Sequence, residues 1–425
     1  MNLRPTRLVS PRALTALLSA PLSLALAGCG LLGASGGNGG NGGSGAGGGG
    51  GGKGGGRSFS VAAAGDILIH PQLTDQAARD ARAAGHTGYD FDRIMAGVKP
   101  VISKADLGIC HLEPVLGEPN GPFQTYPDFL VPPQIARTVK SIGYDTCSTA
   151  SNHTLDHGPE GVYRTLDTLD REGLKHTGSA RSQQEADKPN ILDVKGVKVA
   201  QISFASGFNG REVPGDKPWL ANLVSVKAVA AAEKRARAAG AEVVILSVHW
   251  GREHQPDPSG PQLELARKIA EGTGVDLVIG HHAHVVQPME KIGGTWVAYG
   301  LGNQLARHDV PSGLTEEGVI GWFDFTEKNG KWEVQARFVP TYTDIPPDPE
   351  STPGTDLPGA APAPVRDHRL VDVAASLASG TAPDGKELLP EQRARYRLAF
   401  ERTRGTLLNR GAGKDGLRPL RELPD

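Results

Sequence analysis

Short apolar runs recur along the middle of the chain and alternate with segments in which apolar residues return at helical spacing. Runs of this length, rich in Val, Ile and Leu, are typical of buried strands, and the segments between them are typical of amphipathic helices. The predicted strands cover residues 59–64, 105–111, 144–149, 191–194, 197–204, 243–248, 275–279, 296–299, 319–326 and 331–339. The predicted helices cover residues 72–84, 133–142, 159–172, 227–239, 263–271, 370–377 and 391–406.

Two pairs of neighbouring apolar runs are separated by two residues that favour a tight turn. Lys195-Gly196 separates one pair and Asn329-Gly330 separates the other. Both spacings predict β-hairpins, which add antiparallel strands to the parallel strands expected from strand–helix alternation. The pattern therefore predicts a mixed α/β domain, which we place at residues 57–344.

The first 28 residues have the layout of a secretory signal. Three arginines and no acidic residue accompany an apolar run at 13–27, which is too short for a spanning helix. The run ends in Leu26-Ala27-Gly28-Cys29, which is similar to a bacterial lipobox and predicts lipidation of Cys29. The alternative is an ordinary signal peptide with Cys29 as an incidental thiol. Both interpretations predict export, and the first predicts a lipid anchor in the cell membrane, facing outward.

Segments of low complexity flank the predicted domain. Residues 29–56 are almost entirely glycine, cannot form a core, and are predicted to be a flexible tether with a reach of about 29 Å. Residues 345–365 are rich in Pro, Ala and Gly and are predicted to be a linker. Residues 366–425 form an Arg-rich, partly helical C-terminal tail, which either packs against the domain or trails from it.

Two further cysteines, Cys110 and Cys147, lie in predicted strands. A disulfide between them is possible in an exported protein, and two buried free thiols are the alternative. The net charge of −2 becomes more negative without the first 28 residues. A mildly acidic chain argues against general nucleic-acid binding, which usually needs a basic face.

Six turns that carry polar side chains follow apolar runs directly. In open α/β sheets, ligands bind beyond the carboxyl ends of the strands, so these turns predict one shared pocket. Imidazole, carboxylate and amide groups suit divalent Mn, Zn or Fe. The turns are Gly65-Asp66, His111-Leu112-Glu113, Ser151-Asn152-His153-Thr154-Leu155-Asp156, His249-Trp250-Gly251-Arg252-Glu253, Gly280-His281-His282-Ala283-His284 and Gly300-Leu301-Gly302-Asn303.

Each residue in these turns also has an ordinary structural interpretation. Asp66 could cap a helix, Glu113 could be a surface acid, Asn152 a turn residue and His249 a buried, hydrogen-bonded histidine. A lone His-x-His such as His282-Ala283-His284 is often accidental, and His281 offers a second register. The common position at strand ends favours a joint metal site over these separate explanations.

The ordered motifs resemble the CapA family of bacterial capsule (poly-γ-glutamate) synthesis proteins, a branch of the calcineurin-like metallophosphoesterase superfamily. The resemblance runs from about Phe59 to Tyr342. It implies a metallophosphatase-like four-layer α/β/β/α sandwich with mixed sheets. The motifs that carry it are Ala64-Gly65-Asp66, Leu112-Glu113, Asn152-His153 with Asp156 and Gly158, His249-Trp250-Gly251 with Glu253, Gly280 through Pro288, and Leu301-Gly302-Asn303.

The resemblance also implies roles for individual residues and one or two divalent metal ions. Asp66 would bind the first metal, Glu113 would bridge, Asn152 and His249 would bind the second, and His282 and His284 would divide between them. His153 would be the proton donor, with Asp156 as the second catalytic candidate. Three departures stand out: Leu68 replaces a customary histidine, Glu113 replaces the customary bridging aspartate, and His111 replaces a customary asparagine. His111, His281 and Glu253 are therefore candidates for additional ligands or supporting groups.

Three functions fit these observations. The first is a metal-dependent hydrolase or transferase acting on an anionic cell-envelope polymer, together with membrane capsule-synthesis proteins. The second is a non-catalytic capsule assembly or export factor with a metal site, and the third is a surface phosphoesterase. Trp250, Phe208 and Trp219 are either pocket walls or core aromatics, and Arg211 and Arg252 either hold an anion or are solvated.

Overall fold

The structure is a computed structural model that describes residues 56–345 and 367–423. The predicted signal peptide (1–28), the cysteine proposed for lipidation, almost all of the tether (29–56) and almost all of the linker (345–365) lie outside the described residues. Within the described residues, no helix combines the length and the hydropathy that crossing a bilayer requires.

A nine-stranded mixed sheet forms one half of the core, with the path β16-β15-β14-β1-β2-β5-β6, β13 beside β1, and β17 beside β15. β1 pairs in parallel with β2 and β13 and antiparallel with β14, so both orientations meet in this sheet. Its strands are β1 (Ser58–Leu68), β2 (Leu107–Leu112), β5 (Thr146–Ser148), β6 (Lys175–Thr177), β13 (Asn303–Ala306), β14 (Glu317–Lys328), β15 (Lys331–Asp344), β16 (Arg369–Asp372) and β17 (Arg418–Pro419).

A six-stranded mixed sheet with the order β11-β12-β10-β9-β8-β7 forms the other half. Its central strands run parallel, and a hairpin partner lies at each edge. Its strands are β7 (Asn190–Val194), β8 (Val197–Ala205), β9 (Val243–His249), β10 (Leu277–His281), β11 (Met289–Ile292) and β12 (Thr295–Ala298). β3 (Val115–Leu116) and β4 (Leu130–Val131) form a separate small ladder.

The two sheets pack face to face, as the side chains of β1 show. Successive side chains of a strand point to opposite faces. Val61 and Ala63 pack with Val243 and Ile279 of the six-stranded sheet. Ala62 and its alternate neighbours pack on the opposite side, among the residues of the helices. From Phe59 onward β1 is buried on both faces, which explains the continuous apolar run from Val61 to Ala64.

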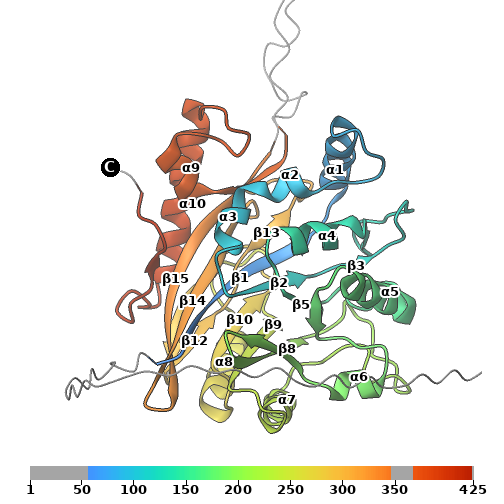
Figure 1. Ribbon diagram of the computed structural model, residues 1–425, viewed down its shortest axis with the longest axis vertical. Coiled ribbons are helices and arrows are strands. Elements are labelled where there is room, and N and C mark those ends of the chain that lie inside the picture. The colour runs from blue at the N-terminus through green and yellow to red at the C-terminus, as the bar shows by residue number, and fades with distance from the viewer. Residues whose placement is uncertain (1–55, 346–366, 424–425) are drawn as a thin grey trace, which may run out of the picture. The chain divides into compact units, whose positions relative to one another are not determined.

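Helices cover the outer faces of both sheets (Figure 1). Helices α1 to α5 pack on the nine-stranded sheet, and α7 and α8 pack on the six-stranded sheet. The result is the four-layer α/β/β/α arrangement expected from the sequence. The helices are α1 (Pro71–Ala83), α2 (Asp92–Met95), η1 (Ala96–Val98), α3 (Lys99–Ile102), α4 (Gln134–Ser141), α5 (Gly158–Arg171), α6 (Gln183–Asp187), α7 (Val226–Ala238), α8 (Gly260–Gly272), α9 (Val373–Ser379) and α10 (Pro390–Leu408).

Both predicted hairpins are confirmed. Val194 pairs with Val197, and Lys328 pairs with Lys331. The two residues of each turn have positive φ, with Asn329 at 51° and Gly330 at 74°. This is the type I′ geometry, which matches the twist of the flanking strands.

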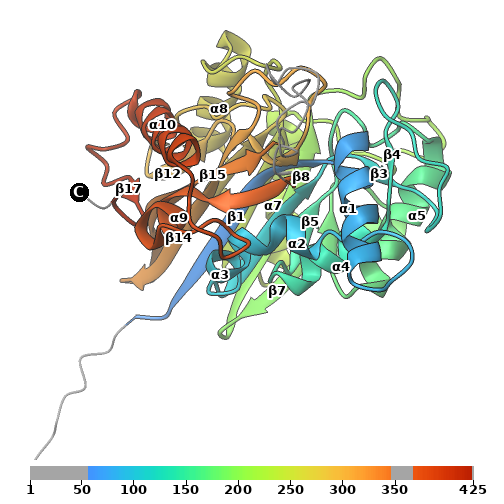
Figure 2. The same ribbon diagram turned by 90° about the horizontal axis from the view of Figure 1, so that it is seen from above.

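The C-terminal segment contributes a strand to the main sheet. The helix predicted for 370–377 is wrong at its start, because residues 369–372 form β16 and pair with β15. Asp372 ends the strand by capping α9, accepting from the Ala375 N–H at 3.0 Å. Figure 2 shows α9 and α10 on the side of the sheet away from α4 and α5. The segment from 367 therefore packs against the domain, while the predicted domain boundaries remain predictions.

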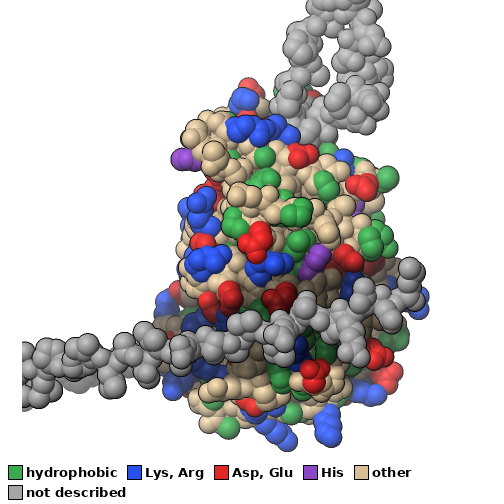
Figure 3. All heavy atoms as spheres, turned by 90° about the vertical axis from the view of Figure 1, so that its right-hand side faces the viewer, with side chains coloured by type: hydrophobic (Ala, Val, Ile, Leu, Met, Phe, Trp, Pro, Cys, Tyr) green, Lys and Arg blue, Asp and Glu red, His purple; other side chains and the backbone are tan. Residues whose placement is uncertain are grey.

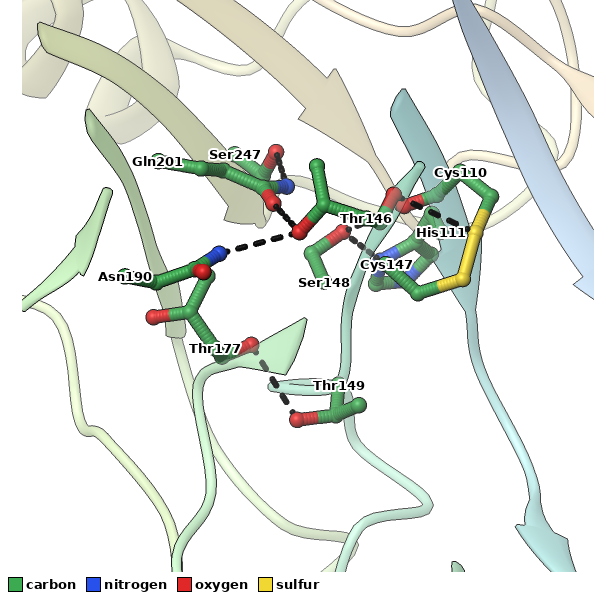
Figure 4. The surroundings of a disulfide bond; sticks show 10 residues. All are labelled: Cys110, His111, Thr146, Cys147, Ser148, Thr149, Thr177, Asn190, Gln201 and Ser247. Atoms are coloured by element: carbon green, nitrogen blue, oxygen red, sulfur yellow. Dashed lines mark hydrogen bonds between the residues drawn. A yellow bond between two sulfur atoms is a disulfide. The ribbon is translucent and has the colours of Figure 1, made fainter. Parts of the chain in front are cut away.

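Cys110 and Cys147 form a disulfide, which settles the alternatives left open by the sequence. They are directly paired residues of the neighbouring parallel strands β2 and β5. Figure 4 shows the disulfide next to His111 and Ser148, which follow the two cysteines along the chain. The bond links two strands at the point where they enter the candidate site.

Candidate metal centre

The strand ends that carry the predicted polar residues meet between the two sheets. β1, β2, β5 and β13 supply them from one sheet, and β9 and β10 supply them from the other. Asp66 lies inside β1, where the register with both β2 and β13 shifts. A register shift of this kind re-aims a side chain, and here it accompanies Asp66.

Asp66 forms a first cluster with His111 and His281. One donor atom from each lies within 4.8 Å of the others. The Nδ1 atom of His281 is 3.1 Å from Oδ1 of Asp66, and the rings of His111 and His281 stack at a centroid distance of 3.9 Å. Asp66 lacks the customary histidine two residues later, because Leu68 stands there. His111 and His281, which the sequence indicated only as additional candidates, lie beside Asp66 instead.

Asp66 also forms a second cluster with Glu113 and His284. His284 Nε2 is 3.6 Å from Glu113 Oε1, and His284 Nδ1 is 3.4 Å from Asp66 Oδ2. Asp66 is the member common to both clusters. The bridging role that the resemblance gives to Glu113 remains a prediction.

Asn152 and His249 adjoin these clusters. His249 Nε2 is 2.9 Å from Asn152 Oδ1 and 3.9 Å from Glu113 Oε1, while its Nδ1 is 3.0 Å from His111 Nε2. The structure therefore brings Asp66, Glu113, Asn152, His249 and His284 together, as the sequence predicted.

His282 and Glu253 occupy different positions from the other candidates. The backbone N–H of His282 donates to Asp66 Oδ2 at 3.0 Å, and its ring lies 4.5 Å from that of His249. Its ring nitrogens belong to neither cluster. Glu253 is exposed, and no hydrogen bond or ion pair among the described residues joins its side chain to a cluster. Their roles as ligands remain predictions.

The backbone around the centre is unusual. His282 and His284 have φ values of 91° and 54°, which non-glycine residues seldom adopt outside turns and functional sites. Gly280, expected to provide the bend, has ordinary φ. It is needed instead for close approach, because a Cβ there would lie 1.9 Å from the Tyr299 carbonyl oxygen.

His153 and Asp156 form a buried pair beside the clusters. His153 Nδ1 is 2.6 Å from Asp156 Oδ2, which also accepts the Phe129 N–H at 2.8 Å. Arg211 donates to the other oxygen of Asp156 at 3.4 Å and pairs with Asp128. Asp156 therefore fixes one ring nitrogen of His153 and leaves Nε2 as the nitrogen that can face a reacting group.

Burial moves the pKa values of the carboxyl groups and imidazoles of the centre away from their ordinary values. Burial raises the pKa of Asp66 to about 6, and burial together with Asp66, Glu253 and Asp156 raises the pKa of Glu113 well above its usual range. Burial and neighbouring imidazoles hold the pKa values of His249 and His284 well below theirs. Neutral imidazoles are the form that binds metals.

Glu113 is the residue that tests whether these groups suit a cation. It is 1% exposed, and neither carboxylate oxygen has a hydrogen-bond partner among the described residues. An unpaired buried polar group costs on the order of a few kcal/mol, and an unpaired charge costs more. The neighbouring imidazoles of His249 and His284 and the carboxylate of Asp66 would complete a ligand set for a divalent cation. The residues therefore fit a metal.

Two further residues of the site carried no assigned role in the sequence. Asn209, with φ of 48°, accepts from Asn152 Nδ2 at 3.2 Å and lies 3.4 Å from His153 Nδ1. Asn209 lies in the segment after β8, so the criterion applied to the other turns, a polar residue that follows a predicted strand, would also have identified Asn209. Asn303 Oδ1 is 2.9 Å from His284 Nδ1.

The aromatic and arginine residues considered for the pocket have different surroundings in the structure. Trp250 is a core residue, 1% exposed, and its Nε1 donates to the Tyr299 carbonyl. Arg211 forms ion pairs with Asp128 and Asp156, so its guanidinium already has anionic partners within the protein. Arg252 is exposed. Basic and acidic side chains are interspersed over the face shown in Figure 3, with no continuous basic area visible there.

A third group with suitable donor atoms lies at the surface, formed by Asp170, His176 and Glu185. Arg181 already pairs with both of its carboxylates, at 2.6 Å from Asp170 and at shorter range from Glu185. The guanidinium of Arg181 supplies the positive charge that balances the two carboxylates. This group therefore differs from the buried centre, where the Glu113 carboxylate has no hydrogen-bond partner among the described residues.

Fold and site together define an α/β sandwich protein with a buried carboxylate–histidine centre at its strand ends. The sequence model of the family described as bacterial capsule synthesis protein PGA_cap matches residues 60–308, more than half of the chain. The chain belongs to this family.

Relatives carry related descriptions. PGA biosynthesis protein CapA of Bacillus subtilis (strain 168) is 31% identical over 173 residues, which cover 39% of this chain and 44% of that protein. Capsule biosynthesis protein CapA of Bacillus anthracis is 26% identical over 224 residues, covering 51% and 54%. The chain thus spans about half the length of these relatives.

Solved structures show weaker likeness. A calcineurin-like phosphoesterase of Bacillus subtilis has a TM-score of 0.38 at 17% identity, covering 66% of this chain and 90% of that chain. The NAD nucleotidase of Haemophilus influenzae has a TM-score of 0.41 at 13% identity, covering 81% and 56%.

Proposed function

We propose that this protein is a membrane-tethered, metal-dependent hydrolase or transferase that acts on an anionic cell-envelope polymer of the poly-γ-glutamate type. The observation that carries the proposal is the buried, unpartnered carboxylate of Glu113 among neutral imidazoles. Family membership supports the polymer class, and the N-terminal sequence supports the tether and the outward location.

The proposed ligands are Asp66, Glu113 and His284, with His111 and His281 on the far side of Asp66 and with Asn152, His249 and His282 adjoining. When bound, a divalent ion such as Mn, Zn or Fe supplies Lewis-acid polarisation of a carbonyl or phosphoryl oxygen.

His153 is the proposed proton donor to the leaving atom. Its Nδ1–H is held by Asp156, so the proton that His153 gives to the leaving atom comes from Nε2, and His153 acts as donor when both ring nitrogens carry protons. Phe129 packs edge-on against the His153 ring at 4.8 Å and excludes water from that side. Asn209 limits rotation of Asn152, whose Nδ2 donates to Asn209 Oδ1.

The test uses the full-length protein and a charge-removing variant. Elemental analysis is expected to find divalent metal in the wild type and much less in Glu113→Gln, with Glu271→Gln, an exposed glutamate of α8, as the matched control. The wild type is then incubated with poly-γ-glutamate, whose chain length is followed by size-exclusion chromatography, and with phosphomonoesters and phosphodiesters. Shortening or transfer of the polymer that is lost in Glu113→Gln supports the proposal, and turnover of phosphoesters alone would replace it with the phosphoesterase.

A second candidate is a non-catalytic capsule assembly factor whose metal site is structural. The burial of the centre favours it, since Asp66, Glu113 and His284 are at most 3% exposed. Metal in the wild type without turnover of any of these substrates would favour this function, provided that Glu113→Gln abolishes polymer display in cells.

A further inference from the structure

The C-terminal helix α10 holds a turn next to the metal centre through two arginines. Arg395 Nη1 donates to Glu317 Oε1 at 2.6 Å, and Arg402 Nε donates to Glu317 Oε2 at 3.1 Å. Both guanidinium groups also donate to the Gly313 carbonyl oxygen. Glu317 is 3% exposed, so this ion-pair cluster is largely shielded from water.

The turn at 312–317 is also fixed by its own hydrogen bonds. The backbone N–H of Thr315 donates to Ser312 Oγ at 3.0 Å, and the backbone N–H of Gly313 donates to Glu316 Oε2 at 2.6 Å. These bonds and the two arginines determine the position of the Thr315 carbonyl oxygen. That oxygen accepts from Asn303 Nδ2 at 2.8 Å.

Asn303 in turn determines which nitrogen of His284 carries a proton. Its Nδ2 faces two carbonyl oxygens, those of Thr315 and of His284, the latter at 3.3 Å. An amide nitrogen donates and an amide oxygen accepts, so Oδ1 is the atom 2.9 Å from His284 Nδ1. Nδ1 must therefore carry the proton, and Nε2, 3.6 Å from Glu113 Oε1, keeps the lone pair.

We propose that Asn303 is the positioning residue of His284, and that Arg395 and Arg402 of α10 hold Asn303 in place through the 312–317 turn. The inference rests on the proposed metal binding and adds the C-terminal segment to the residues that position a metal ligand. The family match ends at residue 308, so everything in this chain of contacts beyond Asn303 and His284 lies outside it. Groups that orient a ligating histidine commonly contribute 10- to 100-fold in metal affinity.

The first experiment titrates Co²⁺ alone into the metal-free full-length protein and follows its visible absorption. Asn303→Leu is expected to weaken Co²⁺ binding about 10- to 100-fold and to change the spectrum. Asn190→Leu is the matched control, since Asn190 also donates a hydrogen bond but to Thr146, outside the clusters. Equal affinity and an equal spectrum in Asn303→Leu and wild type would overturn the role of Asn303.

The second experiment tests the arginines. Removing them alone would leave Glu317 as an uncompensated buried charge and could unfold the chain, so Arg395→Met and Arg402→Met are combined with Glu317→Met. This triple variant is expected to weaken Co²⁺ binding several-fold and to alter its spectrum. Arg395→Lys with Arg402→Lys, which keeps the charges, is expected to retain most of the affinity.

Two controls separate positioning from stability. Arg397 and Arg404 form no ion pair with any residue that the structure describes, so their replacement by Met should leave Co²⁺ binding unchanged. Phe400→Leu, in the core of α10, lowers stability without touching the turn. If the triple variant binds Co²⁺ like the wild type, the inference fails while the proposed function stands. If the wild type binds no Co²⁺, the proposed metal centre itself fails.

Discussion

At Glu113 the chain buries a carboxylate that no donor among the described residues reaches. Its residue type and place after β2 were predictable from the sequence, because a polar residue directly after a buried strand tends to face the ligand crevice. Its lack of a partner was not predictable, since that depends on which side chains of the other sheet arrive beside it. His281 and His282 show the same limit, because His281 ends β10 and His282 begins the irregular turn after it, where side-chain directions have no fixed period.

Glu113→Gln is expected to stabilise the metal-free protein. Burying this unpartnered carboxyl group costs free energy whether it stays ionised or takes up a proton, and glutamine avoids that cost, so the free energy of unfolding of the chelated protein should rise by about 1–3 kcal/mol at pH 7.5. Urea denaturation in chelator measures it, with Glu271→Gln as the control. A loss of stability in Glu113→Gln under these conditions would contradict the view that the carboxylate is poised for a cation.

His368 should make the protein less stable in acid. Burial, followed by Arg307, Arg79 and Arg369, lowers the pKa of His368 to about 4 from an ordinary value of 6.5. Its neutral form is favoured in the folded state, so the stability is full above pH 6.5 and declines as the pH falls toward 4. At pH 5 the decline attributable to this residue is about 2 kcal/mol.

Urea denaturation at pH 7.5 and pH 5.0 tests this for wild type and His368→Leu. The difference in unfolding free energy between the two pH values should be about 2 kcal/mol smaller in the variant. His86→Leu, at an exposed histidine, is the control and should behave like the wild type. An equal acid loss in wild type and His368→Leu would show that other groups are responsible.

Among the elements, long apolar strands and hairpins were predictable, whereas short paired segments were not. β9 and β14 are identified by their own composition, and Lys195-Gly196 and Asn329-Gly330 by their turn chemistry. β16 resembles the start of a helix, because Leu370 and Leu377 are also spaced for one. Its extended form comes from backbone pairing with β15, which local sequence does not encode.

The disulfide between β2 and β5 should contribute substantially to stability. It closes a loop with a sequence separation of 37 residues, for which chain entropy gives about 4 kcal/mol, and measured values are commonly 2–4 kcal/mol. Cys110→Ala with Cys147→Ala is therefore expected to lower the unfolding free energy by this amount. Because the linked strands carry His111 and Ser148, weaker metal binding should accompany the loss.

The control for this prediction is chemical reduction. A reducing agent should destabilise the wild type and leave the double alanine variant unchanged. If reduction has no effect on the unfolding midpoint of the wild type, the bond does not contribute to stability.

At the scale of the whole molecule, Cys29 should decide whether the protein stays with the membrane. Lipid chains contribute on the order of 0.8 kcal/mol per buried methylene, and within the described residues no helix is long and apolar enough to cross a membrane. Cys29→Ala is expected to move the protein from the membrane fraction to the soluble exported fraction, as measured by fractionation and immunoblotting. Retention of Cys29→Ala in the membrane fraction would contradict the lipid-anchor prediction.

The sequence by itself determined the alternation of strands and helices, the two hairpins and the residue types at the strand ends. These features depend on local periodicity, turn chemistry and composition, all of which act within a few residues. Only the tertiary structure decided that Asp66 belongs to two clusters, that Glu113 has no hydrogen-bond partner among the described residues, and that α10 reaches His284 through Asn303. Those facts depend on contacts between segments up to hundreds of residues apart, which form when two sheets close on one another and which no local pattern records.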